Sequence, residues 1–394
     1  MNKLKRGATA LWPLIDASAG KRGQLYKPID QKLYRRIDPV IFIAKLAIFA
    51  ALLLLFGYGI LSDDSTVTVM ISLILGIPPL LMAWEILTGT EGVAMTVRKL
   101  TLLTVVPLVV LSTALAAGAP VLKVLCQIGL GVVLAGGTEL AHQALHRTGV
   151  GKAVWDHPIG AVLCGLTGIS FRFYQWHHLW HHKYNGTEKD SESFDYLYSL
   201  LKSESRTTRI LGFILHVSMV AHYVSMLHRM WLAITGRLAA VLLVRRPEMS
   251  ESSARKIQCE YRIMAAVLIA GLGVSIALQT TLLLMVWLIP VLIGWGPAHA
   301  LIEFGEHWQC DTPTGNVFVN TRSIRAGRFA QLLTNSNDAH LAHHYDMHVP
   351  MDKLEAFEEW LASSHSFKYV EESYLTFFGK VVRYLWTGKV DQCS

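Results

Sequence analysis

Long runs of apolar residues dominate the chain and predict helices that cross a membrane. Polar turns separate the first four runs, which are Val40–Leu61, Val67–Leu87, Leu100–Ala117 and Val121–His142. About 20 apolar residues, at a helical rise of about 1.5 Å each, are enough to span the roughly 30 Å hydrocarbon core of a bilayer. Because successive spans alternate in direction, these four runs are expected to form two hairpins.

A fifth run, Ile263–Trp295, holds 33 residues without one charge. As a single helix it would measure roughly 50 Å, well beyond the bilayer core. We therefore predict two short spans joined by a turn at Gln279–Thr281, which gives about six transmembrane helices in all. The two-span version also keeps the histidine-rich segments before and after this run on the same side of the membrane.

The segment between the fourth and fifth runs is mixed in character. Its shorter apolar pieces, Ile159–Phe171 and Ile210–Leu232, are predicted to be helices that lie on or dip into the membrane surface. The second piece carries three histidines that recur every six residues, do not share one helical face and are interpreted as interfacial residues: His216, His222 and His228. The final segment, Ala298–Ser394, is soluble in character.

Composition and charge agree with a single polytopic membrane domain over residues 39–394. Hydrophobic residues make up 52% of the 394 and charged residues only 16%, against about 25% in soluble domains. Residues 1–38 are basic and lack the apolar core of a signal peptide, so we expect them to be an N-terminal cytoplasmic segment. The net charge of +7 needs no nucleic acid to explain it, and the five cysteines form no CxxC pair that would indicate a thiolate metal site.

The candidate chemistry lies in the histidines, because eight of the 17 fall in three short boxes. The boxes read HxxxH, HxxHH and HxxHH and contain His142 and His146, then His178, His181 and His182, then His340, His343 and His344. In a helix, positions i, i+3 and i+4 share one face, so each box gathers its imidazoles together. His307, in the sequence GEHW, stands alone. Imidazole nitrogens suit iron, zinc, copper and nickel, and so many of them imply two ions rather than one.

Several other metal sites fit the pattern less well. Structural zinc needs four ligands and favours cysteine, and a zinc protease needs HExxH, where this chain has Gln143. Soluble di-iron bundles use glutamates. The remaining common kind of site is a pair of irons bound mainly by histidines beside a membrane. A metal transporter or sensor would place its histidines inside the spans, facing a pore, whereas these boxes fall at or beyond the ends of the apolar runs.

Some neighbouring residues leave alternatives open. His177 in place of His178 would give an HxxxHH box, but position i+5 turns away from i, so geometry favours His178. Carboxylates close to the boxes are candidates to accept the second N–H of a metal-bound imidazole: Glu139, Asp190, Glu306 and Asp338. His157, in HPIG, is not expected to bind haem, because no haem domain surrounds it. His348 is interpreted as a structural residue.

These motifs resemble the membrane fatty acid desaturase superfamily, which also includes alkane hydroxylases and carotenoid ketolases. The resemblance covers about Gly137–Leu361 and rests on HQALHR, HHLWHHKYNGTEKDSES and GEHW…NTRSIRAGRFAQLLTNSNDAHLAHHYDMHVPMDKL. The eight box histidines match the family's boxes, and His307 matches a ninth histidine that many members carry. Asn320–Arg322 and Val349–Pro350 are similar to the bacterial desaturase branch.

The resemblance implies an all-α fold with transmembrane hairpins and a helical cytoplasmic cap that holds a di-iron site. It implies two iron ions (Fe2+/Fe3+) that use O2 to oxidise C–H bonds of a lipid acyl chain, with desaturation favoured over hydroxylation, ketolation or oxidative decarboxylation. The chain has no flavin, haem or ferredoxin module, so electrons must come from a ferredoxin- or rubredoxin-like donor with its reductase. A basic cytoplasmic face suits an acidic donor. The expected location is a bacterial inner membrane, with the boxes on the cytoplasmic side.

Overall fold

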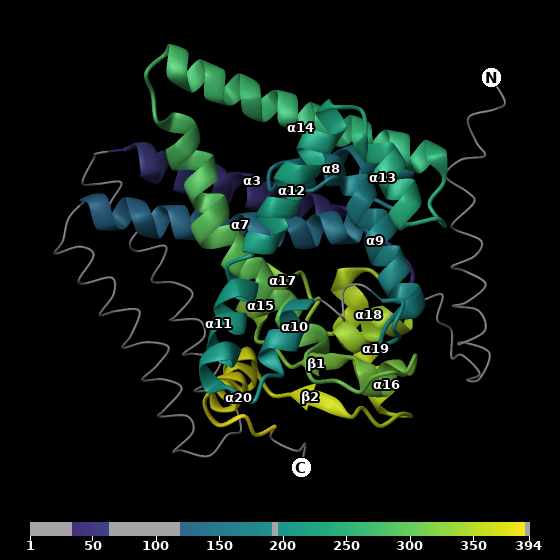
Figure 1. The fold of residues 1–394 in the computed structure, drawn as a ribbon. Helices are drawn as coiled ribbons and strands as arrows, with labels where there is room; N and C mark the ends of the chain where they lie inside the picture. Colours follow the sequence, from purple (N-terminus) through teal and green to yellow (C-terminus); the bar gives the residue numbers. More distant parts are fainter. Residues whose placement is uncertain (1–33, 63–118, 191–195, 391–394) are drawn as a thin grey trace.

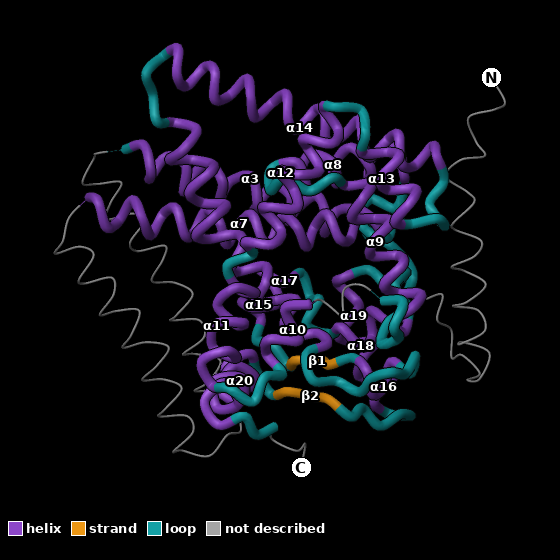
Figure 2. Tube along the Cα trace, in the orientation of Figure 1, coloured by secondary structure: helices purple, strands orange, loops and turns teal. Residues whose placement is uncertain are grey.

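The computed structural model describes residues 34–62, 119–190 and 196–390, and all statements below concern these ranges. They fold into helices and one short pair of strands (Figures 1 and 2). The second and third apolar runs, Val67–Leu87 and Leu100–Ala117, lie outside the described residues, as does most of the basic segment. The prediction of about six spans therefore stays a prediction for those two runs, and so does the boundary at residue 38.

Within the described ranges, four helical segments are long and apolar enough to cross a membrane. They are α3 (Pro39–Leu61), α7 (Ala119–Leu145), α14 (Glu251–Ala277) and the segment Leu284–His307, which comprises η2 (Leu284–Leu288), η3 (Val291–Trp295) and α15 (Gly296–His307). Many outward side chains of α3 and of the later part of α14 are apolar, as Leu54 at 76% and Ile276 at 77% exposure illustrate. Apolar side chains that are not buried by protein indicate that lipid covers these faces.

The long apolar run divides where predicted, because the chain turns between Ala277 and Leu282. Two candidate spans lie on either side of this turn, as predicted, but both are longer than the apolar run indicated. Helix α14 begins at Glu251, well before the apolar run, and the last span continues to His307. A helix extends beyond its apolar stretch wherever charged residues can face water, and apolar length alone does not reveal such extensions. The last candidate span therefore ends at His307 and overlaps the start of the segment predicted to be soluble, Ala298–Ser394.

Shorter helices connect the spans. They are α8 (Ala153–Gly165), α9 (Phe171–Tyr184), α10 (Tyr196–Leu201), α11 (Arg206–Val217), α12 (Val220–Ile234) and α13 (Leu238–Arg245). Helices α11 and α12 together are apolar enough for a fifth span but are bent by 47°, with Met219 between them at a left-handed φ of 53°. The apolar piece predicted as one surface helix is thus two. His216 is buried against Phe304, so it is not an interfacial residue.

Helix α7 lies at the centre of the spans, because its glycines let neighbouring helices approach closely. Phe49 and Phe56 of α3 contact Gly137 and Gly129 of α7, and a Cβ at either glycine would overlap the ring. On another face, Gly131 lies against the backbone of Pro290 and Gly294. Proline lacks an N–H, and the two π-helical turns η2 and η3 flank this residue. Paired glycines at such a crossing are a common means of packing membrane helices.

Gly131→Ala is expected to destabilise the protein, because the new methyl group would meet backbone atoms that no rotamer change can move. We expect the free energy of unfolding to fall by about 1–3 kcal/mol, as for other overpacked cores. Thermal unfolding in detergent micelles measures this effect. Gly57→Ala on α3 is the matched control, since nothing lies within 4 Å of a Cβ at Gly57. Equal unfolding temperatures in the two variants would contradict the close crossing.

The segment after His307 forms a compact cap, which lies below the spans in Figure 1. Its elements are α16 (Val317–Asn320), β1 (Arg322–Ile324), α17 (Arg328–Thr334), α18 (His340–Tyr345), α19 (Met351–Ala362), β2 (Tyr369–Glu371) and α20 (Tyr374–Thr387). The two strands pair in parallel, with Ser323 opposite Val370. Helix α18 carries the third histidine box and is buried. Arg35 bonds to Asp346 just after α18, which ties the start of the described chain to the cap.

A hydrogen bond from the Ser323 hydroxyl to the Glu358 carboxylate joins β1 to α19. Burial raises the pKa of Glu358 to about 7 from its ordinary 4.5, and the nearby Asp338 carboxyl adds to the rise. The folded protein therefore binds a proton that the unfolded chain releases above pH 4.5. Stability is lost as the pH rises from 4.5 through 7, by about 1–3 kcal/mol, and stays at the lower level above that range.

Glu358→Gln is expected to remove this dependence, because the amide cannot ionise. The difference in unfolding temperature between variant and wild type should grow in favour of the variant from pH 5 to pH 8. Glu355→Gln, at an exposed position of the same helix, serves as the control and should run parallel to wild type. Parallel curves for Glu358→Gln as well would show that this carboxyl ionises freely.

Candidate metal centre

Nine histidines converge in two compact groups. The first group contains His142, His146, His178, His182 and His343, and the second contains His181, His307, His340 and His344. In each group, one nitrogen from every ring lies within 4.8 Å of all the others. Eight of these side chains are buried and His307 is partly buried. All eight box histidines and the isolated His307 therefore lie in the centre.

The helices divide the boxes between the two groups in a regular way. Members four residues apart, which stack one turn above each other, stay together: His142 with His146, His178 with His182, and His340 with His344. The remaining member of each HxxHH box joins the other group, so His181 faces the second and His343 the first. The sequence pattern predicts one shared face for each box, whereas the structure directs each HxxHH box to two neighbouring sites and the HxxxH box to one.

The Nε2 atoms point inward in both groups. In the second group they form a closed ring in which each neighbouring pair is 3.0–3.2 Å apart: His181 to His307, His307 to His340, His340 to His344, and His344 to His181. In the first group, the Nε2 of His178 lies 2.8 Å from that of His142 and 3.0 Å from that of His182. His343 and His146 extend this chain at 2.9 and 3.3 Å.

The hydrogen bonds on the outer side of the rings fix the tautomer for three ligands. The Nδ1 of His181 donates to Asp190 at 2.9 Å, that of His307 to the backbone carbonyl of Asn320 at 3.0 Å, and that of His340 to the side-chain oxygen of Asn337 at 3.1 Å. A neutral imidazole carries one N–H, so its Nε2 then offers only a lone pair.

Lone pairs that face each other at about 3 Å repel, and a cation between them removes the repulsion. Burial, followed by the neighbouring imidazoles, lowers the pKa of His146, His182, His340, His343 and His344 well below the usual 6.5. These rings are therefore neutral, which is the ligating form. Two opposed ligands at a metal–nitrogen distance of about 2.1 Å lie about 4.2 Å apart, and this agrees with the spread of each group. The residues fit two metal ions, one in each group.

The four carboxylates expected to support the ligands differ in their placement. Asp190 is buried and bonded to His181. Glu139 lies 3.6 Å from the Nδ1 of His142 and equally far from His299, beyond hydrogen-bond distance. The carboxylate of Glu306 lies 3.3 Å from the Nε2 of His340, the inward-facing nitrogen, rather than from its Nδ1. Asp338 accepts a bond from Thr334, and burial raises its pKa to about 6.

Sequence reasoning missed the amides that hold the centre from outside. Asn337 accepts from His340 and donates to Glu306 at 2.7 Å. The buried Asn185 lies 3.2 Å from the Nδ1 of His344 and joins it to Asn320 and Thr321. Asn337 and Asn185 each lie three residues from a box histidine, which was the only available signal.

The segment Asn320–Arg322 was noted only for its resemblance to one branch of a family, and the structure gives it a role. Arg322 is buried and donates to the carbonyls of Gly305 and Trp308, at 3.0 and 2.8 Å. These carbonyls lie at the carboxyl end of α15, on either side of His307. Because the last carbonyls of a helix lack partners within it, a buried guanidinium there stabilises the helix end that carries the ligand.

Three other histidines considered from the sequence lie outside both groups. His177 stacks on Phe173, with ring centroids 5.6 Å apart, and is absent from both groups, whereas its neighbour His178 belongs to the first. His157 packs against Phe171, and His348 lies beside Asp346. The structure therefore places His178, and not His177, among the clustered nitrogens.

The fold and the centre together define a class: a multi-pass helical membrane protein with a buried, histidine-rich site that could hold metal ions. The fatty acid desaturase family model matches residues 118–376, which covers about two thirds of the chain and all nine clustered histidines. The chain belongs to the fatty acid desaturase family. This agrees with the resemblance found from the histidine boxes. None of the curated proteins compared with the chain matches it.

Proposed function

We propose that the protein is a membrane-bound, O2-dependent non-haem di-iron oxidoreductase that desaturates a fatty acyl chain. The single observation that carries this proposal is the pair of adjacent histidine groups, with inward-facing Nε2 atoms, in a chain of this family. Neutral imidazoles without thiolates suit iron, and two groups suit two ions. When bound, two irons with O2 and electrons supply an oxidant strong enough to remove hydrogen from an unactivated C–H bond.

The side chains of the two histidine groups would bind the irons and keep bulk water away from them. His142, His146, His178, His182 and His343 would bind one iron, and His181, His307, His340 and His344 the other. Their burial excludes bulk water from the reacting atoms. Asp190, Asn320 and Asn337 would keep three rings in the ligating tautomer. We name no catalytic residue beyond the metal ligands.

Desaturation balances with O2, two electrons and two protons: the acyl chain loses two hydrogens, a carbon–carbon double bond forms and two waters are released. The electrons would come from a ferredoxin- or rubredoxin-like donor and its reductase. His142 and His307 lie in the last turns of candidate membrane-spanning segments. A fatty acyl chain held in the bilayer would therefore have a short path to the histidine groups. We place the histidine groups on the cytoplasmic side of a bacterial inner membrane, the side expected from the basic residues before the first span.

Expression in a bacterial host with a ferredoxin and its reductase, followed by mass spectrometry of the extracted lipids, tests the proposal. The expected result is new acyl chains that are two mass units lighter, together with close to two irons per purified protein. New hydroxyl or keto groups would assign the protein to the hydroxylases or ketolases instead, and terminal alkenes to the oxidative decarboxylases. An iron-free protein that binds or moves zinc would overturn the proposal.

A further inference from the structure

Helix α9 carries a second feature, on the face opposite to its metal-binding histidines. Trp176 stacks on Trp180 with ring centroids 5.4 Å apart, and Trp180 contacts Tyr184 at 4.4 Å. These residues follow a spacing of four, so they form one stripe along the helix. The tryptophans are buried, at 4% and 9% exposure, while Tyr184 is partly exposed. We call these three side chains the aromatic stripe.

Positive charges lie over this stripe. The ammonium group of Lys183 is 5.8 Å from the Trp180 ring and 5.1 Å from the Tyr184 ring, and that of Lys189 is 5.3 Å from the Tyr184 ring. The guanidinium of Arg246 is 5.7 Å from the ring of Trp176. Lys189 is exposed, and Lys183 and Arg246 are partly exposed. We call these three cations the α9 basic surface. Glu188 and Glu248 are close to it in sequence, and Arg245 adds a further positive charge.

A continuous chain of bonds links the stripe to the second histidine group. The Nε1 of Trp180 donates to the backbone carbonyl of Lys189 at 3.0 Å. The next residue, Asp190, accepts from the Nδ1 of His181 at 2.9 Å. The Nε2 of His181 belongs to the closed ring of four nitrogens. Two hydrogen bonds and the short connection between Lys189 and Asp190 therefore link the ring of Trp180, beneath the α9 basic surface, to the proposed metal ligand His181.

We propose that an acidic one-electron iron–sulfur protein docks on the α9 basic surface and passes its electron through Trp180, Lys189 and Asp190 to the metal held by His181. This inference rests on the proposed function, which needs an external reductant. In each transfer one reduced carrier loses one electron and one ferric ion becomes ferrous, so two carriers reduce both irons. Electrons tunnel more readily through covalent and hydrogen bonds than through gaps, and the path from Trp180 to His181 is continuous through such bonds.

Charge complementarity identifies the partner. The chain is basic overall, at +7, and cations on a surface steer an acidic carrier toward it and hold it in register. An electron carrier needs only a small, short-lived interface, so a few cations around a partly exposed aromatic ring are sufficient.

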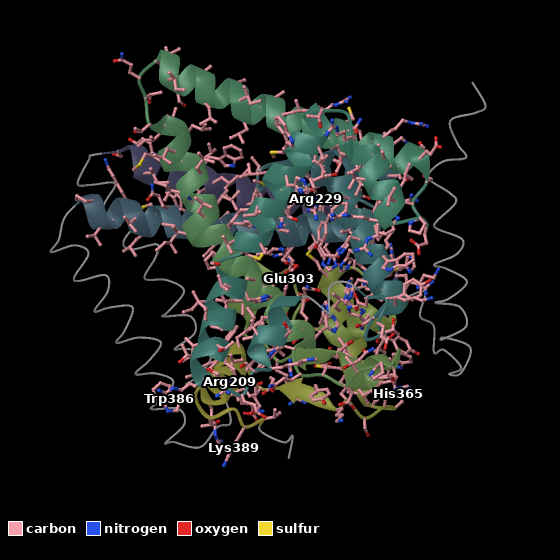
Figure 3. All side chains as sticks on the ribbon, viewed as in Figure 1. Arg209, Arg229, Glu303, His365, Trp386 and Lys389 are labelled. Atoms are coloured by element: carbon pink, nitrogen blue, oxygen red, sulfur yellow. The ribbon has the colours of Figure 1, made fainter. Side chains whose placement is uncertain are left out.

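The docking test uses the purified full-length protein in nanodiscs and a plant-type [2Fe–2S] ferredoxin of net negative charge. Lys183→Glu/Lys189→Glu is expected to raise the Kd for ferredoxin at least about tenfold at low salt, and to flatten the dependence of Kd on salt. Arg383→Glu/Lys389→Glu changes the charge equally near the end of α20, which lies far from α9 in Figure 1; Figure 3 shows Lys389 at the lower end of the molecule. This pair should leave Kd near wild type. Ferredoxin that does not bind wild type, or an equal effect of the two pairs, would overturn the proposal.

The path has its own test. Trp180→Phe keeps a packed ring but removes the N–H that bonds to Lys189. Stopped-flow reduction of the irons by ferredoxin is expected to slow several-fold at unchanged Kd, while reduction by dithionite stays at the wild-type rate. Unchanged reduction by ferredoxin would exclude this path, and a matching loss with dithionite would show damage to the centre instead. Binding is measured without turnover, so a failure of the lipid assay would be distinguishable from a failure of docking.

Discussion

His181→Ala is expected to abolish lipid oxidation and to reduce bound iron from about two to about one or fewer per protein. His181 contributes to the ring of four nitrogens and contacts both His307 and His344. Loss of an outer partner alone costs about 10–100-fold in metal affinity or activity, so loss of a ligand should exceed about 100-fold. Iron analysis of the purified protein and mass spectrometry of the lipids measure the two effects.

His177→Ala provides the matched control, because it removes an imidazole from the same helix outside both groups. It should keep its iron and its product, and His178→Ala should lose both. The opposite result, with His177 essential and His178 dispensable, would show that the second box follows the HxxxHH pattern. Equal membrane expression of all variants is needed to separate metal loss from misfolding.

Asp190→Ala is expected to weaken iron binding by about 10–100-fold, although Asp190 touches no metal in the proposed centre. Its carboxylate holds the Nδ1 proton of His181 and makes the opposite nitrogen more basic. Asp190→Asn keeps an acceptor without the charge, so its effect should be smaller than that of Asp190→Ala. Competition with a chromogenic chelator measures the affinity.

Glu188→Gln serves as the control for Asp190, since Glu188 is exposed two residues away. It should bind iron as wild type does. If Asp190→Ala also kept wild-type affinity, the hydrogen bond to His181 would not contribute to the site.

The candidate ligands could be found from the sequence, because the spacing of each box is a local property of a helix. Their partition into two groups could not, since it depends on how α7, α9, α15 and α18 are oriented in space. Spacing also favours His178 over His177, and the structure places His178 in the cluster. The amides Asn185 and Asn337 have no spacing signal that separates them from the many polar residues of turns.

Apolar length predicted the ends of α3 and α7 to within three residues, but it predicted the ends of the last two candidate spans poorly. Apolar length located α3, α7 and the turn after α14, but it could not show that α14 starts at Glu251 or that the last span continues to His307. Helical hydrogen bonding continues through charged residues that face water, and no apolar pattern marks it. The bend between α11 and α12 depends on the left-handed conformation of one non-glycine residue, Met219, which composition does not predict.

The division of each HxxHH box between the two histidine groups has a thermodynamic consequence. An ion in the first group orders α9 and α18 through His178, His182 and His343, and the same two helices present His181, His340 and His344 to the second group. The conformational entropy that α9 and α18 lose when the first ion binds is not lost again when the second ion binds. Metal loading should therefore be cooperative, with a steep titration and few half-loaded molecules, and each ion should raise the affinity for the other by the same factor.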